Sequence, residues 1–361
     1  MVERVEKLED LLQEMVDRGA SDLFLKAGSR PAMRIDGEIV LTDYGEMTMD
    51  ETQAIALQLM TPEQAEYFAR IPEMDLAVGV RGVGRFRVNI FRQRGSVGLV
   101  FRYISNPTFS FDDLNLPPVV RTLAEKRRGL ILVTGTTGSG KSTTLAAMIN
   151  HINHTRRCHI VTIEDPIEFL HQDELAIINQ REVGFDTKSF SDALKHVMRQ
   201  SPDVILIGEM RDLETISTAI AAAETGHLVL STLHTIDAVQ TVERIINYFP
   251  AYLHPQIRME LALCLQGVIC QRLLPLASGR GRIPAVEILV STPTIRKLLH
   301  EGKTLELPVH IEAGGHVGMQ TFNQSLLQLY RMKKIRMEDA LLYASSPDEF
   351  RLMAEGIRCP V

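Results

Sequence analysis

The sequence predicts an α/β protein in which a domain built on a parallel sheet follows a small α+β domain. The length of 361 residues suggests two hydrophobic cores. Strand and helix patterns alternate after about residue 119, which is typical of a parallel sheet covered on both faces. Before residue 105 the segments read instead as short strands with few helices. Apolar residues form 45% of the chain and charged residues 23%, as in ordinary globular proteins.

The first domain is predicted to span residues 1–104. Apolar residues recur at helical spacing over residues 2–16, and Gly19 follows as a stop signal. The Asp36-Gly37 dipeptide interrupts an apolar segment and favours a tight hairpin turn. Helices are expected near residues 50–60 and 62–70, and strands at residues 22–25, 32–41, 75–80, 85–91 and 97–103. This mixture predicts a largely antiparallel sheet.

A proline-rich linker and a second domain follow. Residues 105–118 contain Pro107, Pro117 and Pro118 and form the predicted linker. The second domain is predicted to span residues 119–361. Its expected strands lie at residues 130–134, 159–164, 203–207 and 227–232, with helices between them. Beyond Pro250 the pattern predicts helices with little strand, including a long amphipathic stretch over residues 255–274.

Composition limits where the protein acts and what it binds. No apolar run approaches the roughly 20 residues that cross a bilayer, and the charged N-terminus lacks a signal-peptide block. We therefore expect a cytoplasmic protein without direct membrane insertion. The net charge of −6 does not favour nucleic acid as a partner. The four cysteines, at irregular spacings, are expected to be reduced packing residues: Cys158, Cys264, Cys270 and Cys359.

Residues 129–148, GLILVTGTTGSGKSTTLAAM, carry the strongest chemical signal. GTTGSGKS matches G-x-x-x-x-G-K-[ST] between an apolar strand and a helix. In such a loop, backbone N–H groups turn inward onto phosphates at a helix N-terminus. Lys141 is predicted to reach the β and γ phosphates of ATP, and the Ser142 hydroxyl to ligate magnesium. The predicted nucleotide-binding residues of this loop are Gly135, Thr136, Thr137, Gly138, Ser139, Gly140, Lys141, Ser142 and Thr143.

Carboxylates follow the next apolar strand, HIVTIEDPIEF, which ends in Glu164, Asp165 and Glu168. Because the carboxyl ends of parallel strands line the ligand crevice, this acidic cluster should face the same crevice as the P-loop. Carboxylates there can hold hydrated magnesium or polarise an attacking water. The alternative interpretation is a solvated acidic turn.

The strand in DVILIGEMRDLET, residues 203–215, ends unusually. Many phosphate-binding ATPases place an aspartate directly after the apolar strand to hold magnesium, whereas this chain has Gly208 and then Glu209. We expect the longer Glu209 side chain to orient a magnesium-bound water. Arg211 and Asp212 are expected to form a salt-bridged helix start, with Asp212 as N-cap.

Two histidines, His227 and His234, flank the strand at residues 227–232. Histidines in such positions are often structural. Here both could donate hydrogen bonds to phosphate or to the acidic cluster and so report the nucleotide state.

Four segments, in order and spacing, resemble the Walker A, Asp box, Walker B and His box of the secretion ATPases of the type II and type IV pilus superfamily. They are TGTTGSGKST, TIEDPIEF, ILIGEMRDLETI and GHLVLSTLHT. Within that superfamily the chain is most similar to the PilT/PilU-type retraction ATPases of type IV pili. TIRKLLHEGK resembles their AIRNLIRE motif, with Thr294, Lys297 and His300 differing. Assembly ATPases usually carry a four-cysteine zinc motif, and here only Cys264 and Cys270 lie in that region.

The resemblance implies a homo-hexamer whose subunits join a PAS-like N-terminal domain to a RecA-like P-loop ATPase domain, with nucleotide bound between them. It implies that Arg85, Arg94 and Arg102 sense nucleotide, although a row of arginines on a sheet is also read as a salt-bridged face. It further implies magnesium-dependent ATP hydrolysis that drives pilus retraction and twitching motility, with Glu164 activating the water and Glu209 and His234 as further catalytic residues.

The same resemblance implies partners and a location. The expected partners are an inner-membrane platform protein and a paralogous retraction ATPase, at the cytoplasmic face of the inner membrane. Thr136 departs from the family pattern, where proline is common, but the backbone cradle should survive this difference. The resemblance does not separate PilT from PilU, and it gives no role to the tail, residues 331–361.

Three other functions stay open. The first is a pilus or secretion assembly ATPase of the same superfamily. The second is a RecA-like nucleic-acid translocase, which would favour aromatic stacking, whereas this chain has 6% aromatic residues and no tryptophan. The third is a nucleotide-binding regulator without turnover, against which the intact set Lys141, Glu164, Glu209 and His234 argues.

Overall fold

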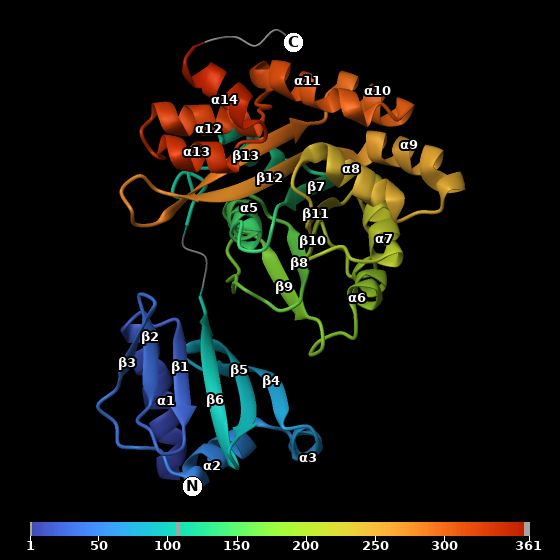
Figure 1. Cartoon of the computed structure of the whole chain (residues 1–361). Coiled ribbons are helices and arrows are strands. Elements are labelled where there is room, and N and C mark those ends of the chain that lie inside the picture. Colours follow the sequence, from blue (N-terminus) through green and yellow to red (C-terminus); the bar gives the residue numbers. More distant parts are fainter. Residues whose placement is uncertain (1, 106–108, 357–361) are drawn as a thin grey trace. The chain divides into compact units, whose positions relative to one another are not determined.

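The computed structural model describes residues 2–105 and 109–356 (Figure 1). The chain divides into two compact units. Unit 1 comprises Met1–Asn106 with Glu168–Leu170, and unit 2 comprises Pro107–Ile167 and His171–Val361. Both units combine helices with a sheet, so the predicted α/β fold class is confirmed. Within the described ranges, no helix is both long and apolar enough to span a membrane.

Unit 1 is built on an antiparallel sheet with the strand order β3-β2-β1-β6-β5-β4. Its strands are β1 (Asp22–Lys26), β2 (Ala32–Ile35), β3 (Glu38–Leu41), β4 (Glu73–Val80), β5 (Gly84–Gln93) and β6 (Ser96–Ile104). Its helices are α1 (Val2–Asp17), α2 (Met49–Leu59) and α3 (Pro62–Arg70). The predicted hairpin turn is confirmed, because Asp36 and Gly37 have φ of 50° and 89° between β2 and β3.

Local sequence signals start the helices of unit 1 where they were expected. Thr48 and Glu51 form a capping box at the start of α2, and Thr61 and Gln64 form another at α3. Each box satisfies backbone N–H groups that the first helical turn leaves without partners. These caps therefore mark the starts of two separate short helices, as predicted.

Unit 2 is built on a sheet with the strand order β13-β12-β7-β11-β10-β8-β9. Neighbouring strands from β12 to β9 run parallel, and β13 is antiparallel to β12. The strands are β7 (Gly129–Thr134), β8 (His159–Glu164), β9 (Ile177–Glu182), β10 (Val204–Ile207), β11 (Leu228–Leu233), β12 (Leu265–Pro275) and β13 (Arg282–Val290). This order brings the carboxyl ends of β7, β8, β10 and β11 to one edge of the sheet.

The prediction of a helix over residues 255–274 was wrong in its second half. Helix α9 (His254–Cys264) ends at Cys264, and β12 begins directly at Leu265. The apolar residues of β12 are buried against β7, so helical and strand patterns merge into one apolar stretch in the sequence. Sequence reasoning also missed β13, which pairs with β12 as a long hairpin, and β9.

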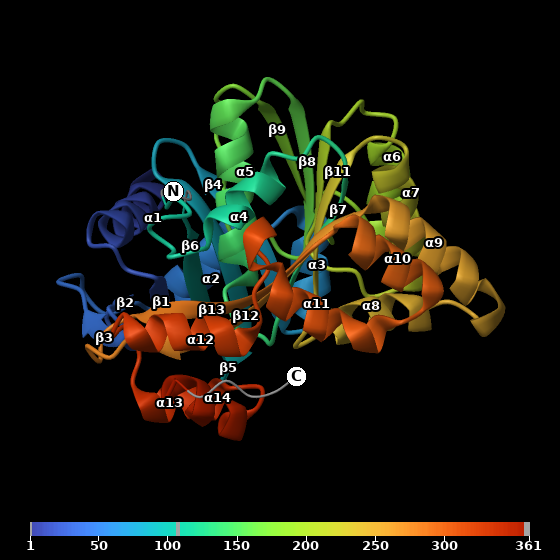
Figure 2. The same ribbon diagram turned by 90° about the horizontal axis from the view of Figure 1, so that it is seen from above.

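Helices cover both faces of the parallel sheet (Figure 2). Helices α4 (Pro118–Ala124) and α5 (Lys141–Thr155) lie on one face, and α6 (Phe190–Val197), α7 (Leu213–Glu224) and α8 (Ala238–Asn247) on the other. Leu130 and Leu132 belong to one core and Ile131 and Val133 to the other, which explains why these strands read as continuous apolar runs.

The C-terminal part of unit 2 is helical and packs around the β12–β13 hairpin. It contains α10 (Pro293–Glu301), α11 (Leu307–Ala313), α12 (Phe322–Arg331), α13 (Met337–Tyr343) and α14 (Pro347–Ala354). Short 3₁₀ helices at Thr304–Glu306 and Gly314–Val317 connect α10, α11 and α12, and a third, at Ala251–Leu253, lies between α8 and α9. Figure 1 shows α12 and α13, in red, beside the hairpin in orange.

The cysteines of the described residues are free thiols. Cys264 and Cys270 are buried and Cys158 is partly buried. Burial raises the pKa of Cys264 to about 12, so this thiol stays protonated and behaves as a small apolar residue. Three of the four cysteines are thus reduced packing residues, as predicted, and Cys359 lies outside the described residues.

Candidate active site

The loop between β7 and α5 contains three glycines with positive φ. Gly135, Gly138 and Gly140 have positive φ of 146°, 76° and 92°. A Cβ atom on Gly135 would lie 2.5 Å from the carbonyl oxygen of Gln271 and 2.5 Å from Oγ of Ser139. The loop is therefore pressed against β12 on one side, and its backbone folds tightly into the first turn of α5.

Lys141 lies across this loop. Its Nζ donates hydrogen bonds to the carbonyl oxygens of Gly135 and Thr136, both at 3.0 Å. The ammonium group is thus held at the loop while Ser142 and Thr143 occupy the first turn of α5. The positive end of the helix dipole, inward N–H groups and a lysine together form the chemistry that binds phosphate groups.

Glu164, the last residue of β8, is held by two side chains. Oγ1 of Thr162 donates to its Oε1 at 2.6 Å, and Nε2 of Gln180 donates to the same oxygen at 3.1 Å. The Gln180 side chain is in turn fixed, because its Oε1 accepts from the backbone N–H of His171 at 2.8 Å. Thr162 and Gln180 face each other in the β8–β9 pair. Neighbouring strands therefore orient this carboxylate at the edge that carries the phosphate-binding loop.

The Gly-Glu sequence after β10 follows from packing. The N–H of Gly208 donates to the carbonyl oxygen of Ile163 at 2.7 Å, which ties the end of β10 to that of β8. A Cβ on Gly208 would lie only 3.3 Å from Cα of Glu164 and from that oxygen. An aspartate directly after the strand would be crowded here, so the first acidic side chain comes one residue later.

Glu209 is partnered by an arginine and a histidine side chain. Nη2 of Arg211 lies 2.8 Å from its Oε2, and Nε2 of His234 lies 3.4 Å from its Oε1. Burial raises the pKa of Glu209, but the hydrogen bond from Arg211 and the His234 and Arg211 charges outweigh it and lower the pKa overall. Glu209 therefore carries a negative charge well below neutral pH.

The start of α7 confirms one prediction and corrects another. Oδ1 of Asp212 accepts from the backbone N–H of Thr215 at 2.8 Å, so Asp212 is the N-cap. Arg211, however, pairs with Glu209 and not with Asp212. The arginine thus contributes to the acidic site, not only to the helix start.

A cavity of about 330 Å³ opens over the phosphate-binding loop. The loop lines it with Gly135–Ser139, and the β12–β13 hairpin and the C-terminal helices supply most of the remaining wall. These further residues are Ile236, Gln271, Arg272, Leu273, Arg282 and Tyr343. The sequence did not predict these six residues. Gln271, Arg272 and Leu273 lie in a stretch predicted as a helix, Arg282 lies in the unpredicted strand β13, Tyr343 lies in the tail, and Ile236 lies in a loop without a motif.

Comparison with known proteins identifies the family of this chain. Residues 2–297 match the family model described as Type II/IV secretion system protein. The chain belongs to this secretion family.

Relatives of the same family are similar over nearly the whole chain. The type IV pilus ATPase PilU of Pseudomonas aeruginosa is 45% identical over 347 residues, which cover 96% of this chain and 91% of PilU. The type IV pilus retraction ATPase PilT of the same organism is 44% identical over 341 residues, covering 94% of this chain and 99% of PilT. A crystal structure of the pilus retraction motor PilT with bound ADP matches with a TM-score of 0.85 and 47% identity, covering 94% and 97% of the two chains.

These findings confirm the predicted relation to PilT/PilU-type ATPases. This member of the secretion family is an ATPase, and nucleotide is its cofactor. The identities to PilU and PilT differ by one percentage point, so they do not separate the two.

His227 lies at the wrong end of its strand for the predicted nucleotide contact. It precedes β11, and its carbonyl oxygen accepts from the N–H of Gly129, the first residue of β7. Its Nδ1 lies 2.9 Å from the carbonyl oxygen of Ala222. Because β7 and β11 are parallel, the phosphate-binding loop lies beyond their opposite ends. His227 is therefore a structural residue of the secretion ATPase core, and its predicted role in this site is corrected.

The arginines of unit 1 do not gather at one point. Arg85 and Arg102 lie near one end of the β5–β6 pair, whereas Arg94 is in the turn at the other end, nine residues along β5. At about 3.4 Å per residue this is a separation on the order of 30 Å. The three arginines of one subunit therefore cannot converge on one phosphate group, and their role as nucleotide-sensing residues stays a prediction.

Arg102 already has a partner within unit 1. Its Nε lies 2.8 Å from Oδ1 of Asp22, and Nε of Arg34 lies 3.3 Å from Oδ2 of the same residue. Asp22 is only 3% exposed, so the two guanidinium groups compensate a buried carboxylate. For Arg102, this ion pair fits the alternative interpretation of a salt-bridged sheet face.

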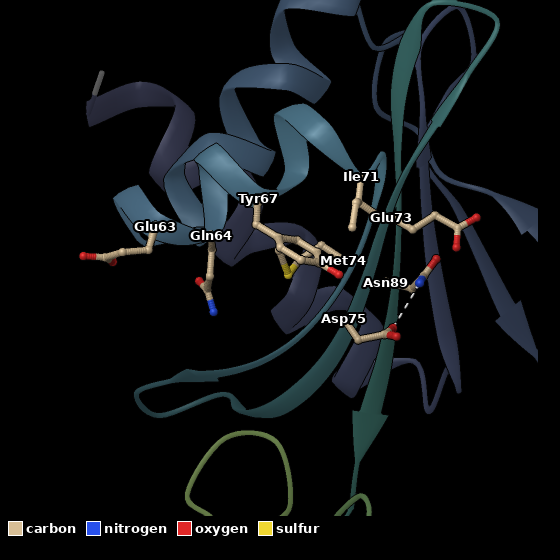
Figure 3. Close-up of a pocket in the computed structure, with 8 residues that line it drawn as sticks. All are labelled: Glu63, Gln64, Tyr67, Ile71, Glu73, Met74, Asp75 and Asn89. Carbon is tan, nitrogen blue, oxygen red and sulfur yellow. Dashed lines mark hydrogen bonds between the residues drawn. The ribbon is translucent and has the colours of Figure 1, made fainter. Parts of the chain in front are cut away.

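A larger cavity, of about 610 Å³, lies in unit 1 between α3 and the edge strand β4 (Figure 3). Its lining contains three carboxylates and no lysine or arginine, and Nδ2 of Asn89 donates to Oδ1 of Asp75 on the neighbouring strand at 3.0 Å. The lining residues are Glu63, Gln64, Tyr67, Ile71, Glu73, Met74, Asp75 and Asn89. Such a charge repels a triphosphate, whereas the cavity in unit 2 is lined by the phosphate-binding loop.

Proposed function

We propose that this chain is the subunit of a hexameric motor that couples ATP hydrolysis to the retraction of type IV pili. The observation that carries the proposal is the similarity to PilU and PilT along nearly the whole chain, combined with an intact phosphate-binding loop and oriented carboxylates. The match to PilU and PilT extends over both units. This supports a shared function of both units and not only of the ATPase core.

Lys141 and the backbone of Gly135–Ser139 hold the β and γ phosphates in this proposal, and Glu164 activates the attacking water. The two donors on Oε1 of Glu164 support that role, because they fix the carboxylate in one orientation at the strand end. His234 and Arg211 keep Glu209 ionised and oriented at the neighbouring strand end. The remaining residues of this segment, Gly140, Ser142 and Thr143, contact phosphate through their backbone N–H groups in this proposal.

Magnesium fits this site as an ion held partly by the substrate. Magnesium prefers hard oxygen ligands and keeps several waters, so it needs few protein ligands when phosphates are present. The hydroxyl of Ser142 in the first turn of α5 is such a ligand, and Glu209 can hold a water of the ion. No three His, Cys, Asp or Glu side chains of the described chain form a metal cluster, which agrees with a substrate-assisted ion. The ion would supply charge neutralisation at the phosphates.

Movement is proposed to arise between the domains of residues 1–104 and 119–361, joined by the linker of residues 105–118; residues 106–108 of this linker lie outside the described part. Arg85 and Arg102, or Arg94, would reach nucleotide when the first domain closes. The hexamer would dock on the inner-membrane platform protein at the cytoplasmic face and pass each closure on to it. A paralogous retraction ATPase is a further proposed partner.

Two outcomes in a piliated host test the proposal. Deleting the gene should leave the cells hyperpiliated, without twitching motility and resistant to pilus-specific phage. Complementation with wild type should restore retraction, whereas Lys141→Ala, without ATP turnover, and Glu164→Gln, which should bind ATP without hydrolysing it, should not. Cells without pili would instead identify an assembly ATPase. Stimulation of the ATPase by single-stranded DNA would favour the translocase.

A further inference from the structure

The C-terminal helices reach the nucleotide cavity of unit 2. Tyr343, the last residue of α13, lines the cavity together with the phosphate-binding loop, although it lies 201 positions or more beyond that loop in the sequence. Helix α13 packs on β12, and Tyr343 is partly buried against the core of this unit. A segment without any motif thus forms part of the wall of the site.

Arg272 fixes this segment in place. Its Nη1 donates a hydrogen bond to the carbonyl oxygen of Tyr343, and its guanidinium carbon lies 3.8 Å from the ring centroid of Phe322 in α12. The guanidinium group is therefore stacked on one helix and bonded to the end of the next. Through these two contacts, Arg272 connects β12 to the C-terminal helices.

The lining of the cavity combines two chemistries. The loop Gly135–Ser139 belongs to a type of loop whose backbone N–H groups suit phosphates. The remaining wall combines an aromatic ring and two aliphatic side chains, from Tyr343, Leu273 and Ile236, with the polar side chains of Gln271, Arg272 and Arg282. Nucleobases bind through stacking on aromatic rings and apolar contact, which this set can supply and a phosphate cannot use.

We propose that Tyr343 forms the base-facing wall of the nucleotide site and that Arg272 is the residue that positions it. The tail of the chain then has a role in holding ATP and ADP by their base. This inference requires a nucleotide site in unit 2 but does not require that the motor acts on pili, so the two proposals fail independently.

The test separates base recognition from phosphate recognition. Calorimetric titration of the full-length protein with ADP, and separately with inorganic tripolyphosphate, measures binding with and without a base. Tyr343→Leu, which keeps apolar bulk without a ring, should weaken ADP binding about tenfold and leave tripolyphosphate binding unchanged. Tyr343→Phe should retain the wild-type affinity for both. Tyr252→Ala, at a tyrosine that is 80% exposed, is the matched control and should change neither.

Arg272 is tested by its coupling to Tyr343. Arg272→Met keeps the stem against Phe322 but removes the donor to the Tyr343 carbonyl. It should weaken ADP binding to the same extent as Tyr343→Leu. The double variant should lose little further affinity for ADP, because each change alone already removes the contact of the Tyr343 ring with the base. Unchanged ADP affinity in Tyr343→Leu, or an equal loss for ADP and tripolyphosphate, would overturn the assignment of the base wall. Additive losses of ADP affinity in the double variant would overturn the positioning role of Arg272.

Discussion

Nε2 of His234 lies 3.4 Å from Oε1 of Glu209, so the carboxyl ends of β11 and β10 meet through two side chains. The backbone supports this contact, because Oγ1 of Thr232 donates to the carbonyl oxygen of Gly208 at 2.6 Å. Arg211 holds the other oxygen of Glu209. The Glu209 carboxylate is therefore held by two partners. Removing either partner should change its orientation toward the nucleotide.

The first prediction concerns this contact. His234→Ala should lower kcat at least tenfold and leave the affinity for nucleotide nearly unchanged, because Glu209 loses an orienting partner while the phosphate-binding loop stays intact. The free energy of unfolding should change by less than about 1 kcal/mol, since the histidine is 44% exposed. Steady-state ATPase assays and ADP titration measure both. His227→Ala is the matched control; an equal loss of turnover there would contradict the assignment of the two histidines to opposite edges of the sheet.

A second prediction concerns the backbone of the phosphate-binding loop. Gly135→Ala should destabilise the protein by roughly 2 kcal/mol or more, because the new Cβ meets the Gln271 carbonyl and the φ of 146° is unfavourable for alanine. Relief of this clash moves the loop away from β12, so nucleotide binding should be lost as well. Chemical unfolding and ADP titration report the two effects. Gly279→Ala also has positive φ but meets no atom within 4 Å, and it should cost less stability and leave binding intact.

Sequence alone predicted the parts of this site that depend on local order along the chain. The loop of Gly135–Ser142 and the carboxylates after β8 and β10 follow directly from strands whose apolar residues are buried on both faces. His227 shows that a position next to a predicted strand does not by itself place a residue in the site. It precedes its strand, and in a parallel sheet only residues that follow their strands share the edge with the phosphate-binding loop. Strand direction, read from the sequence, would have excluded it.

The rest of the site depends on contacts between segments far apart in the sequence. Arg272 and Tyr343 meet only because β12 is a strand beside β7, and its apolar pattern runs on from α9 without a turn signal at Cys264. Gly208 is explained only by its approach to Ile163 and Glu164. Such packing has no local signature, so a single sequence predicts the phosphate end of the cavity but not its other wall.

A third prediction concerns the side chain that orients Glu164. Gln180→Ala should lower kcat roughly tenfold to a hundredfold, the range expected for a lost hydrogen bond to a charged group, while KM stays nearly unchanged. Asn179→Ala, next to it on β9 with its side chain at His159, should retain turnover. Steady-state ATPase kinetics measure kcat and KM of both variants. A rise in KM with unchanged kcat would mean that Gln180 supports nucleotide binding and not the carboxylate.

The last prediction concerns Glu287 of β13, whose Oε1 accepts from the backbone N–H of Ala238 at 2.9 Å at the start of α8. Burial raises the pKa of Glu287 to about 7; the Ala238 N–H and the Arg272 charge oppose this rise, and Asp237 adds to it. Between pH 4.5, the ordinary pKa of the group, and about pH 7, the folded protein keeps a proton that the unfolded chain has released. The free energy of unfolding therefore decreases as the pH rises through this window.

Glu287→Gln removes that titration and keeps an oxygen that can accept from Ala238. Relative to wild type, the variant should gain stability as the pH rises from 5 to 8, by roughly 2 kcal/mol over the window. Urea unfolding at several pH values measures the difference, and Glu312→Gln, at an exposed site, should show no such trend. A difference that is constant from pH 5 to 8 would mean that Glu287 is already ionised in the folded protein, and that Arg272 compensates its charge more strongly than burial opposes it.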